Sequence, residues 1–176
     1  MKLNKLIAIA TISLLSGGIS MAQKALNLED IVAGNIIQTK GIGSMTWLKD
    51  GERYSRLENN KQTGGTDIVA YRAKDNSREV IIPSSLLTDK STGRPIPVRS
   101  VSWSADNEKV LIYNNTRRVW RYDTRGDYWV LNLKDGALRQ LGKGMPESSM
   151  MFAKFSPDGT RVAYVSNNNI YVEDID

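Results

Sequence analysis

The residue types best suited to binding a substrate are concentrated in one stretch, residues 114–129. It contains four arginines and four large aromatic residues: Arg117, Arg118, Trp120, Arg121, Tyr122, Arg125, Tyr128 and Trp129. A guanidinium offers a rigid fork of hydrogen-bond donors to an oxygen acceptor. Residues 109–113 and 128–133 on either side are apolar runs typical of β-strands. We therefore expect the arginines to lie in the connection, or in the distal part, of two neighbouring strands, presented and not buried.

Composition limits the chemistry of the chain itself. The 176 residues include 24 Lys and Arg against 19 Asp and Glu, no His, no Cys and 40% hydrophobic residues. This apolar content supports one modest core, so we expect one domain or part of one. Without His or Cys the chain has no catalytic triad, no disulfide and no zinc–thiolate site. We expect no catalytic residue, metal or cofactor here, and the weak net charge of +5 does not indicate a nucleic-acid partner.

The first 22 residues have the pattern of a signal peptide. Lys2 and Lys5 precede an apolar run, residues 6–15, that is too short to span a bilayer. Ser20 and Ala22 are small residues at the two positions that a signal peptidase reads, so we expect cleavage after Ala22 and export to the periplasm or the medium. A retained membrane anchor is the alternative interpretation.

Residues 23–44 form an N-terminal segment in which we expect one short helix. Asn27 is a good N-cap, Asp30 follows at the capping-box position, and Gly34 can end the helix. One or two helical turns fit between these residues.

From residue 45 onward the chain repeats. Three segments align without gaps, each with an aromatic residue, an Asp-Gly or Asp-Asn pair and an apolar run: residues 47–54, 103–110 and 155–162. A second match follows each of them, beginning at Asp67, Asp127 and Asn169. Asp-Gly and Asp-Asn pairs make tight hairpin turns, so each repeat predicts a series of short antiparallel strands.

Four antiparallel strands per repeat, apolar on both faces, are typical of the blades of a β-propeller. The repeats exceed a compact blade of roughly 40 to 45 residues because of inserts at residues 59–66 and 88–97 and the arginine-rich stretch. We expect an all-β fold, an incomplete propeller of about two and a half blades over residues 45–176, at the front end of a longer protein. A single β-sandwich is the alternative.

Several of these motifs together resemble the N-terminal propeller of bacterial dipeptidyl peptidase IV-like enzymes, in the prolyl oligopeptidase family of serine peptidases. The resemblance covers nearly all of the chain after the signal peptide and is carried by residues 26–31, Trp47 with Asp50-Gly51, residues 115–121, residues 124–129, residues 155–159 and residues 169–172. The pairing of Trp120-Arg121 with the Tyr128-led strand is its most specific part.

The resemblance implies a propeller that caps an α/β-hydrolase domain, which lies outside this chain. It implies release of dipeptides from free N-termini, after Pro or Ala, and it allows a homodimer of the full-length enzyme. It also implies that Arg121 reaches into the active-site cavity and holds a backbone carbonyl of the substrate. From the sequence alone, without this resemblance, the preferred interpretation of Arg121 is one more solvated loop arginine.

Other acidic and glycine-rich positions have simpler interpretations. Glu173-Asp174 is not assigned to the acidic pair that the family uses to bind the substrate's ammonium group, because the resemblance places that pair further downstream. Asp106 and Asp158 are expected to form turns, and residues 63–66 a hairpin tip, not a phosphate loop. The alternative function is a non-catalytic periplasmic propeller that binds a protein partner.

Overall fold

The structure is a computed structural model that describes residues 27–32, 41 and 43–175. The chain divides into two units, residues 1–41 and residues 42–176. In the first unit a short helix, α2, spans Leu28–Val32, and the carbonyl of Asn27 accepts a hydrogen bond from the N–H of Ile31 at 3.3 Å. The predicted short helix is thus confirmed. The predicted signal peptide and the helix end at Gly34 lie outside the described residues.

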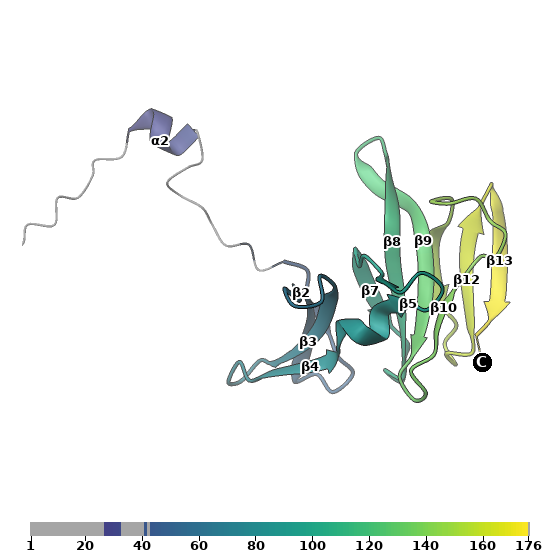
Figure 1. The fold of residues 1–176 in the computed structure, drawn as a ribbon, viewed down its shortest axis with the longest axis horizontal. Helices are drawn as coiled ribbons and strands as arrows, with labels where there is room; N and C mark the ends of the chain where they lie inside the picture. The colour runs from purple at the N-terminus through teal and green to yellow at the C-terminus, as the bar shows by residue number, and fades with distance from the viewer. Residues whose placement is uncertain (1–26, 33–40, 42, 176) are drawn as a thin grey trace, which may run out of the picture. The chain divides into compact units, whose positions relative to one another are not determined.

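The second unit is built from antiparallel sheets, as the repeats predict (Figure 1). The sheet of blade 1 has the order β1-β2-β3-β4 and comprises Thr46–Trp47, Arg53–Asn59, Thr66–Arg72 and Arg78–Ile82. The sheet of blade 2 has the order β7-β8-β9-β10 and comprises Ser100–Trp103, Lys109–Val119, Tyr122–Asn132 and Leu138–Gln140. The sheet of blade 3 has the order β11-β12-β13 and comprises Met151–Phe155, Arg161–Ser166 and Asn169–Asp174.

The connection between blades 1 and 2 contains structure that the sequence did not reveal. A 3₁₀ helix spans Ser84–Leu87, and a two-stranded sheet pairs β5 (Thr88–Asp89) with β6 (Arg94–Pro95). Leu87, the last residue of the helix, is fully buried and packs with residues of blades 1 and 2, directly before the predicted insert at residues 88–97. The helix therefore extends the core of the first two blades.

The three aligned segments occupy the same position in each blade. Their aromatic residues, Trp47, Trp103 and Phe155, are the last residues of β1, β7 and β11. The turn that follows contains a residue with positive φ in each case: 68° at Gly51, 60° at Asn107 and 70° at Gly159. Only Gly, and to a lesser degree Asn, adopts this conformation readily. The alignment of the repeats is thus explained by one shared turn.

The middle blade is buried on both faces. Val110, Ile112 and Leu131 pack with Ile68, Ile82 and Leu87 on the blade 1 side, and all of these side chains are fully buried. On the opposite side, Leu111, Tyr128 and Val130 pack with residues of blade 3 such as Val162 and Tyr164. Successive strand residues point to opposite faces, so strands β8 and β9 need apolar residues at consecutive positions. This is the pattern that predicted stacked blades.

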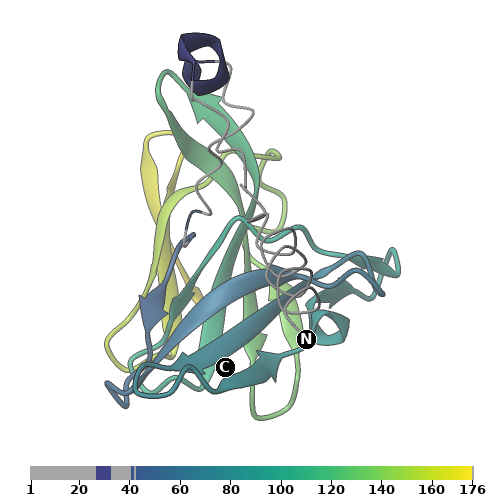
Figure 2. The same ribbon diagram turned by 90° about the vertical axis from the view of Figure 1, so that its left-hand side faces the viewer.

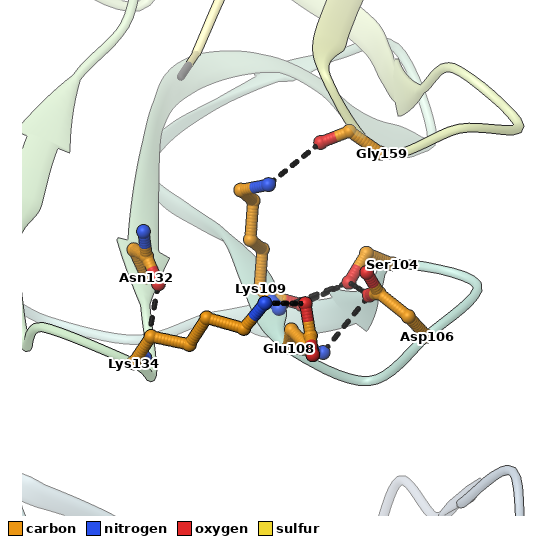
Figure 3. Close-up of polar contacts among 7 residues, drawn as sticks. All are labelled: Ser104, Asp106, Glu108, Lys109, Asn132, Lys134 and Gly159. Carbon is orange, nitrogen blue, oxygen red and sulfur yellow. Dashed lines mark hydrogen bonds and ion pairs between the residues drawn. The ribbon is translucent and has the colours of Figure 1, made fainter.

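The equivalent turns of blades 2 and 3 are also joined by polar contacts (Figure 3). The ammonium group of Lys109 donates a hydrogen bond to the backbone carbonyl of Gly159 at 3.1 Å. Beside it, Ser104 and the N–H of Glu108 both donate to the carboxylate of Asp106, and Lys134 forms an ion pair with Glu108 at 2.6 Å. Asp106 therefore stabilises its own turn, as the sequence predicts.

Candidate functional site

The arginine-rich stretch forms a hairpin arm that extends past the rest of its sheet. Strand β7 pairs with β8 only as far as Ser100 opposite Tyr113. Beyond that point residues 114–119 of β8 and 122–127 of β9 pair with each other, and we call this part the arm. Figures 1 and 2 show it projecting beyond the other strands of blade 2. The prediction that the arginines lie in the distal part of two neighbouring strands is confirmed.

The tip of the arm is the dipeptide Trp120-Arg121. Trp120 has a φ of 62° and is 94% exposed, and Tyr122 beside it is 72% exposed. A left-handed conformation is costly for a bulky residue, so the strand pairing on both sides must hold it. Arg121 is exposed, as predicted for a presented side chain.

A buried carboxylate holds the arm at its base. Asp127 is 7% exposed and accepts two hydrogen bonds, from the backbone N–H of Ser148 at 2.8 Å and from the side-chain amide of Asn115 at 2.6 Å. The hydroxyl of Ser148 donates in turn to the carbonyl of Asn115 at 2.6 Å. These contacts tie the arm to the chain that leads into blade 3. We call this set of three residues the Asp127 clamp.

Blade 1 repeats the same clamp. Asp67 is 8% exposed and accepts from the N–H of Ser84 at 2.7 Å and from the side-chain amide of Asn60 at 3.0 Å. The alignment of the repeats pairs Asp67 with Asp127 as the first residues of two apolar strand segments, but it does not show that their carboxylates are buried. The sequence signal that could have revealed the clamp is an asparagine, Asn60 or Asn115, that precedes each of these aspartates in the same hairpin.

Tyr113 supports the arm from below. Its hydroxyl donates to the carbonyl of Asp123 at 3.0 Å, and its ring stacks on Tyr128 with centroids 4.8 Å apart. Burial raises the pKa of Tyr113 to about 12, with smaller contributions from Tyr128 and the carboxylate of Asp123. Gly126 lies against the same ring, where a Cβ atom would be 2.4 Å from Tyr113 Cε2 and 2.6 Å from the carbonyl oxygen of Asn114. Only glycine fits there without displacing its neighbours.

A polar cavity of about 410 Å³ lies beside the tip of the arm and is called the tip cavity. It is lined by Ser44, Arg99, Ser100, Tyr113, Arg118, Arg121, Tyr122 and Asp123. Arg99 forms an ion pair with Asp123 at 3.1 Å, whereas Arg118 and Arg121 form no ion pair with any described residue. Two guanidinium groups there are thus available to an oxygen-bearing ligand. Arg117 is exposed but does not line this cavity.

A second cavity, of about 580 Å³, lies at the base of the arm and is called the base cavity. It is lined by Pro97, Val98, Arg99, Asn114, Asn115 and Thr116. Asn114 is 7% exposed, and its Oδ1 atom has no hydrogen-bond partner among the described residues. Arg99 lines both cavities, so they adjoin at this side chain. Nothing in the sequence distinguished Asn114 from its exposed neighbours.

The other acidic candidates have structural roles. Glu173 accepts hydrogen bonds from the N–H of Gly142 at 2.7 Å and from the hydroxyl of Tyr164. These contacts hold its carboxylate between the connection that follows blade 2 and strand β12 of blade 3. Within the described part of the chain no cluster of three potential metal ligands occurs. No helix there has the length and apolarity needed to cross a bilayer.

Antiparallel sheets that stack face to face, each with the same Asp-containing turn between its first and second strands, define the second unit as a segment of a β-propeller. The solved structure of dipeptidyl peptidase 4 from Porphyromonas gingivalis contains a region with the same fold as this chain. The two superpose with a TM-score of 0.62 over 86% of this chain and 20% of that one, at 21% sequence identity.

Sequence comparison finds similar proteins with related names. Residues 104–176 match the model of the dipeptidyl peptidase IV N-terminal region. The chain is 25% identical over 166 residues to a probable dipeptidyl-aminopeptidase B of Aspergillus terreus and 27% identical over 152 residues to dipeptidyl aminopeptidase B of Saccharomyces cerevisiae. It spans 18% and 17% of the length of these two relatives. The resemblance to an N-terminal propeller segment of dipeptidyl peptidase IV-like proteins is thus confirmed.

Proposed function

We propose that this chain is the propeller segment of an exported serine exopeptidase, and that it positions the substrate while a separate α/β-hydrolase domain cleaves it. The observation that carries the proposal is Arg121, exposed at the tip of the arm beside a polar cavity and without an ion-pair partner among the described residues. The match to the dipeptidyl peptidase IV N-terminal region supports the reaction class that we propose, release of a dipeptide from a free N-terminus.

The role of Arg121 follows from the chemistry of its surroundings. A peptide carbonyl accepts two hydrogen bonds at most, and a guanidinium can donate both from one side chain. The clamp at Asp127 and the Tyr113–Asp123 contact hold the arm, so the guanidinium is presented from an ordered support. Preorganised donors bind more tightly than flexible ones because less conformational entropy is lost on binding. Arg121 is therefore the residue to which we assign the substrate's backbone carbonyl.

The test is replacement of Arg121 in the full-length protein. Hydrogen bonds to a charged group contribute about 1.5 to 3 kcal/mol, so Arg121→Ala lowers kcat/KM for a Gly-Pro anilide by about 10- to 150-fold. Arg121→Lys restores only part of this activity, because an ammonium keeps the charge but loses the planar fork. Arg117→Ala is the matched control, since Arg117 lies on the same arm but outside the tip cavity. An Arg121→Ala enzyme within about twofold of wild type would contradict the assignment.

A second function is favoured by the exposed aromatic residues of the same tip. Trp120 and Tyr122 are the residue types most often found at the centre of protein–protein interfaces. A non-catalytic periplasmic propeller that binds a protein partner would use them in this way. A fluorophosphonate probe distinguishes the two: it labels the full-length protein if the protein is a serine peptidase and leaves a binding module unlabelled.

A further inference from the structure

The contact that joins the turns of blades 2 and 3 has no counterpart between blades 1 and 2 in the described part of the chain. In the aligned repeats Arg53 takes the position of Lys109, and Asn107 takes the position of Gly159. Lys109 reaches across to the carbonyl of Gly159 at 3.1 Å (Figure 3). Arg53 instead turns back to its own blade and forms an ion pair with Asp50 at 2.7 Å.

A difference between the two turns explains where Arg53 goes. The carboxylate of Asp106 accepts a hydrogen bond from the hydroxyl of Ser104, but Leu48 takes the position of Ser104 in blade 1. The Leu48 side chain has no donor. Asp50, the counterpart of Asp106, accepts from Nε of Arg53 instead. The arginine is thereby held on blade 1 and does not cross to the turn of blade 2.

A cavity of about 450 Å³ lies at this place between blades 1 and 2, and we call it the blade cavity. Its apolar walls are Leu48, Ile81, Trp103 and Leu133. The indole N–H of Trp103 donates to the hydroxyl of Ser55 at 3.2 Å, which fixes the ring between the two blades. Small-molecule sites have volumes of roughly 300 to 1,000 Å³, mostly apolar walls and a few polar groups. The blade cavity meets these criteria.

The charges that line the cavity favour an anion. Arg53 is already paired with Asp50 and, at 3.3 Å, with Glu79. Lys49 also lines the cavity, is exposed and forms no ion pair with any described residue. Apolar walls favour a hydrocarbon or aromatic body, and an unpaired ammonium favours a carboxylate. We therefore propose that the blade cavity binds a small apolar monocarboxylate, with its body against Leu48 and Trp103 and its carboxylate at Lys49.

This site is separate from the proposed substrate site at the arm. Strand β8 begins at Lys109, two residues after Asn107 of the blade cavity, and ends at Val119, directly before the tip of the arm. Its 11 residues rise by about 3.3 Å each, so the two ends lie roughly 35 Å apart. The inference therefore goes beyond the proposed function and adds a second ligand, which does not compete with the substrate.

Isothermal titration calorimetry of the full-length protein with decanoate, below its micellar concentration, tests the site. We expect saturable binding of one molecule per chain with a negative heat-capacity change, the mark of apolar burial. Decylammonium has the same body with the opposite charge, and acetate has the same head group without the body. Both should bind at least about tenfold more weakly. Equal Kd values for decanoate and decylammonium, or no saturable binding of decanoate, overturn the proposal.

Variants locate the ligand in the cavity. Lys49→Ala changes an exposed side chain, so the fold is kept, and it should weaken decanoate binding about 2- to 10-fold. Lys61→Ala is the matched control, because Lys61 is exposed but does not line the cavity, and its Kd should equal that of wild type. Ile81→Trp fills the cavity from the edge strand β4 and should weaken binding at least about tenfold. An unchanged Kd in Lys49→Ala, or an equal loss in Lys61→Ala, overturns the site.

The tip cavity is the competing site for a carboxylate, because Arg118 and Arg121 line it. A ligand in the blade cavity predicts that Arg121→Ala leaves the Kd of decanoate unchanged and that decanoate does not raise KM for a Gly-Pro anilide. Weaker decanoate binding in Arg121→Ala would place the ligand at the arm and overturn the inference. The proposed function is tested separately by kcat/KM of Arg121→Ala, which is measured without decanoate.

Discussion

Exchange of one atom in the Asp127 clamp gives a sharp test of how the arm is held. In Asp127→Asn, the amide oxygen still accepts from the N–H of Ser148, but the new NH₂ group faces the NH₂ group of Asn115, 2.6 Å from the present oxygen. One charge-assisted hydrogen bond is lost and two donors are left unsatisfied. We expect this to lower the free energy of local opening by about 2 to 4 kcal/mol.

The reciprocal exchange should restore the clamp. In the double variant Asn115→Asp/Asp127→Asn the donor and the acceptor change places, so the hydrogen bond forms again. We expect local stability within about 1 kcal/mol of wild type and a coupling energy of about 2 kcal/mol or more between the two positions.

Hydrogen exchange of the Ser148 amide measures this opening directly. A loss of about 2 to 4 kcal/mol accelerates exchange by about 30- to 1,000-fold if exchange is limited by the opening equilibrium. Asp67→Asn is the matched control, because it breaks the same clamp in blade 1 and should accelerate exchange at Ser84 but not at Ser148. If the double variant exchanged as fast as Asp127→Asn, the contact between the two side chains would not be what holds the arm.

Three further outcomes are expected. Hydrogen bonds from Ser104 and the N–H of Glu108 lower the pKa of Asp106 from 3.8 to about 2. The ionised carboxylate therefore contributes fully to the free energy of unfolding above about pH 4, and this contribution is lost as the pH falls towards 2. Acid unfolding followed by circular dichroism should show that Ser104→Ala loses less stability over this range than wild type. Gly126→Ala forces a Cβ into Tyr113 and should cost about 1 to 3 kcal/mol in urea unfolding, whereas Gly93→Ala, which meets no atom within 4 Å, should cost less despite its positive φ of 68°. Residues 23–176 alone should release no dipeptide from a Gly-Pro anilide, because they contain no His, Cys or nucleophile elbow. They should also self-associate in light scattering, because among the described strands β13 pairs with β12 alone and exposes Ile170 and Val172; a monomeric species with a sharp reversible transition would contradict this.

The repeat was predictable because its signals are local. An aromatic residue at a strand end, an Asp and a residue with positive φ lie within a few positions of one another, so Trp103, Asp106 and Asn107 identify their turn without knowledge of the rest of the fold. The same locality made the exposed position of Arg121 predictable.

The parts that escaped prediction depend on distant contacts. Asp127 appears in the sequence as a polar residue at a strand start, and its burial follows from Ser148 and Asn115, 21 and 12 positions away. Asn114 stands in a polar run without apolar alternation, so no periodicity showed that it is enclosed. The 3₁₀ helix at Ser84–Leu87 was missed because its burial depends on blades that come before and after it in the chain.

The contact between Lys109 and Gly159 has a consequence for how blades can be exchanged. Its acceptor is a main-chain carbonyl, which every residue possesses, and the turn that presents it needs only a residue that tolerates a φ of 70°. A blade with an unrelated sequence could therefore be grafted after blade 2 and still receive this hydrogen bond, provided that it keeps the Asp-Gly turn. At this turn the contact between neighbouring blades depends on backbone geometry, whereas in the core it depends on matched apolar side chains, so a grafted blade needs the turn and a complementary apolar face.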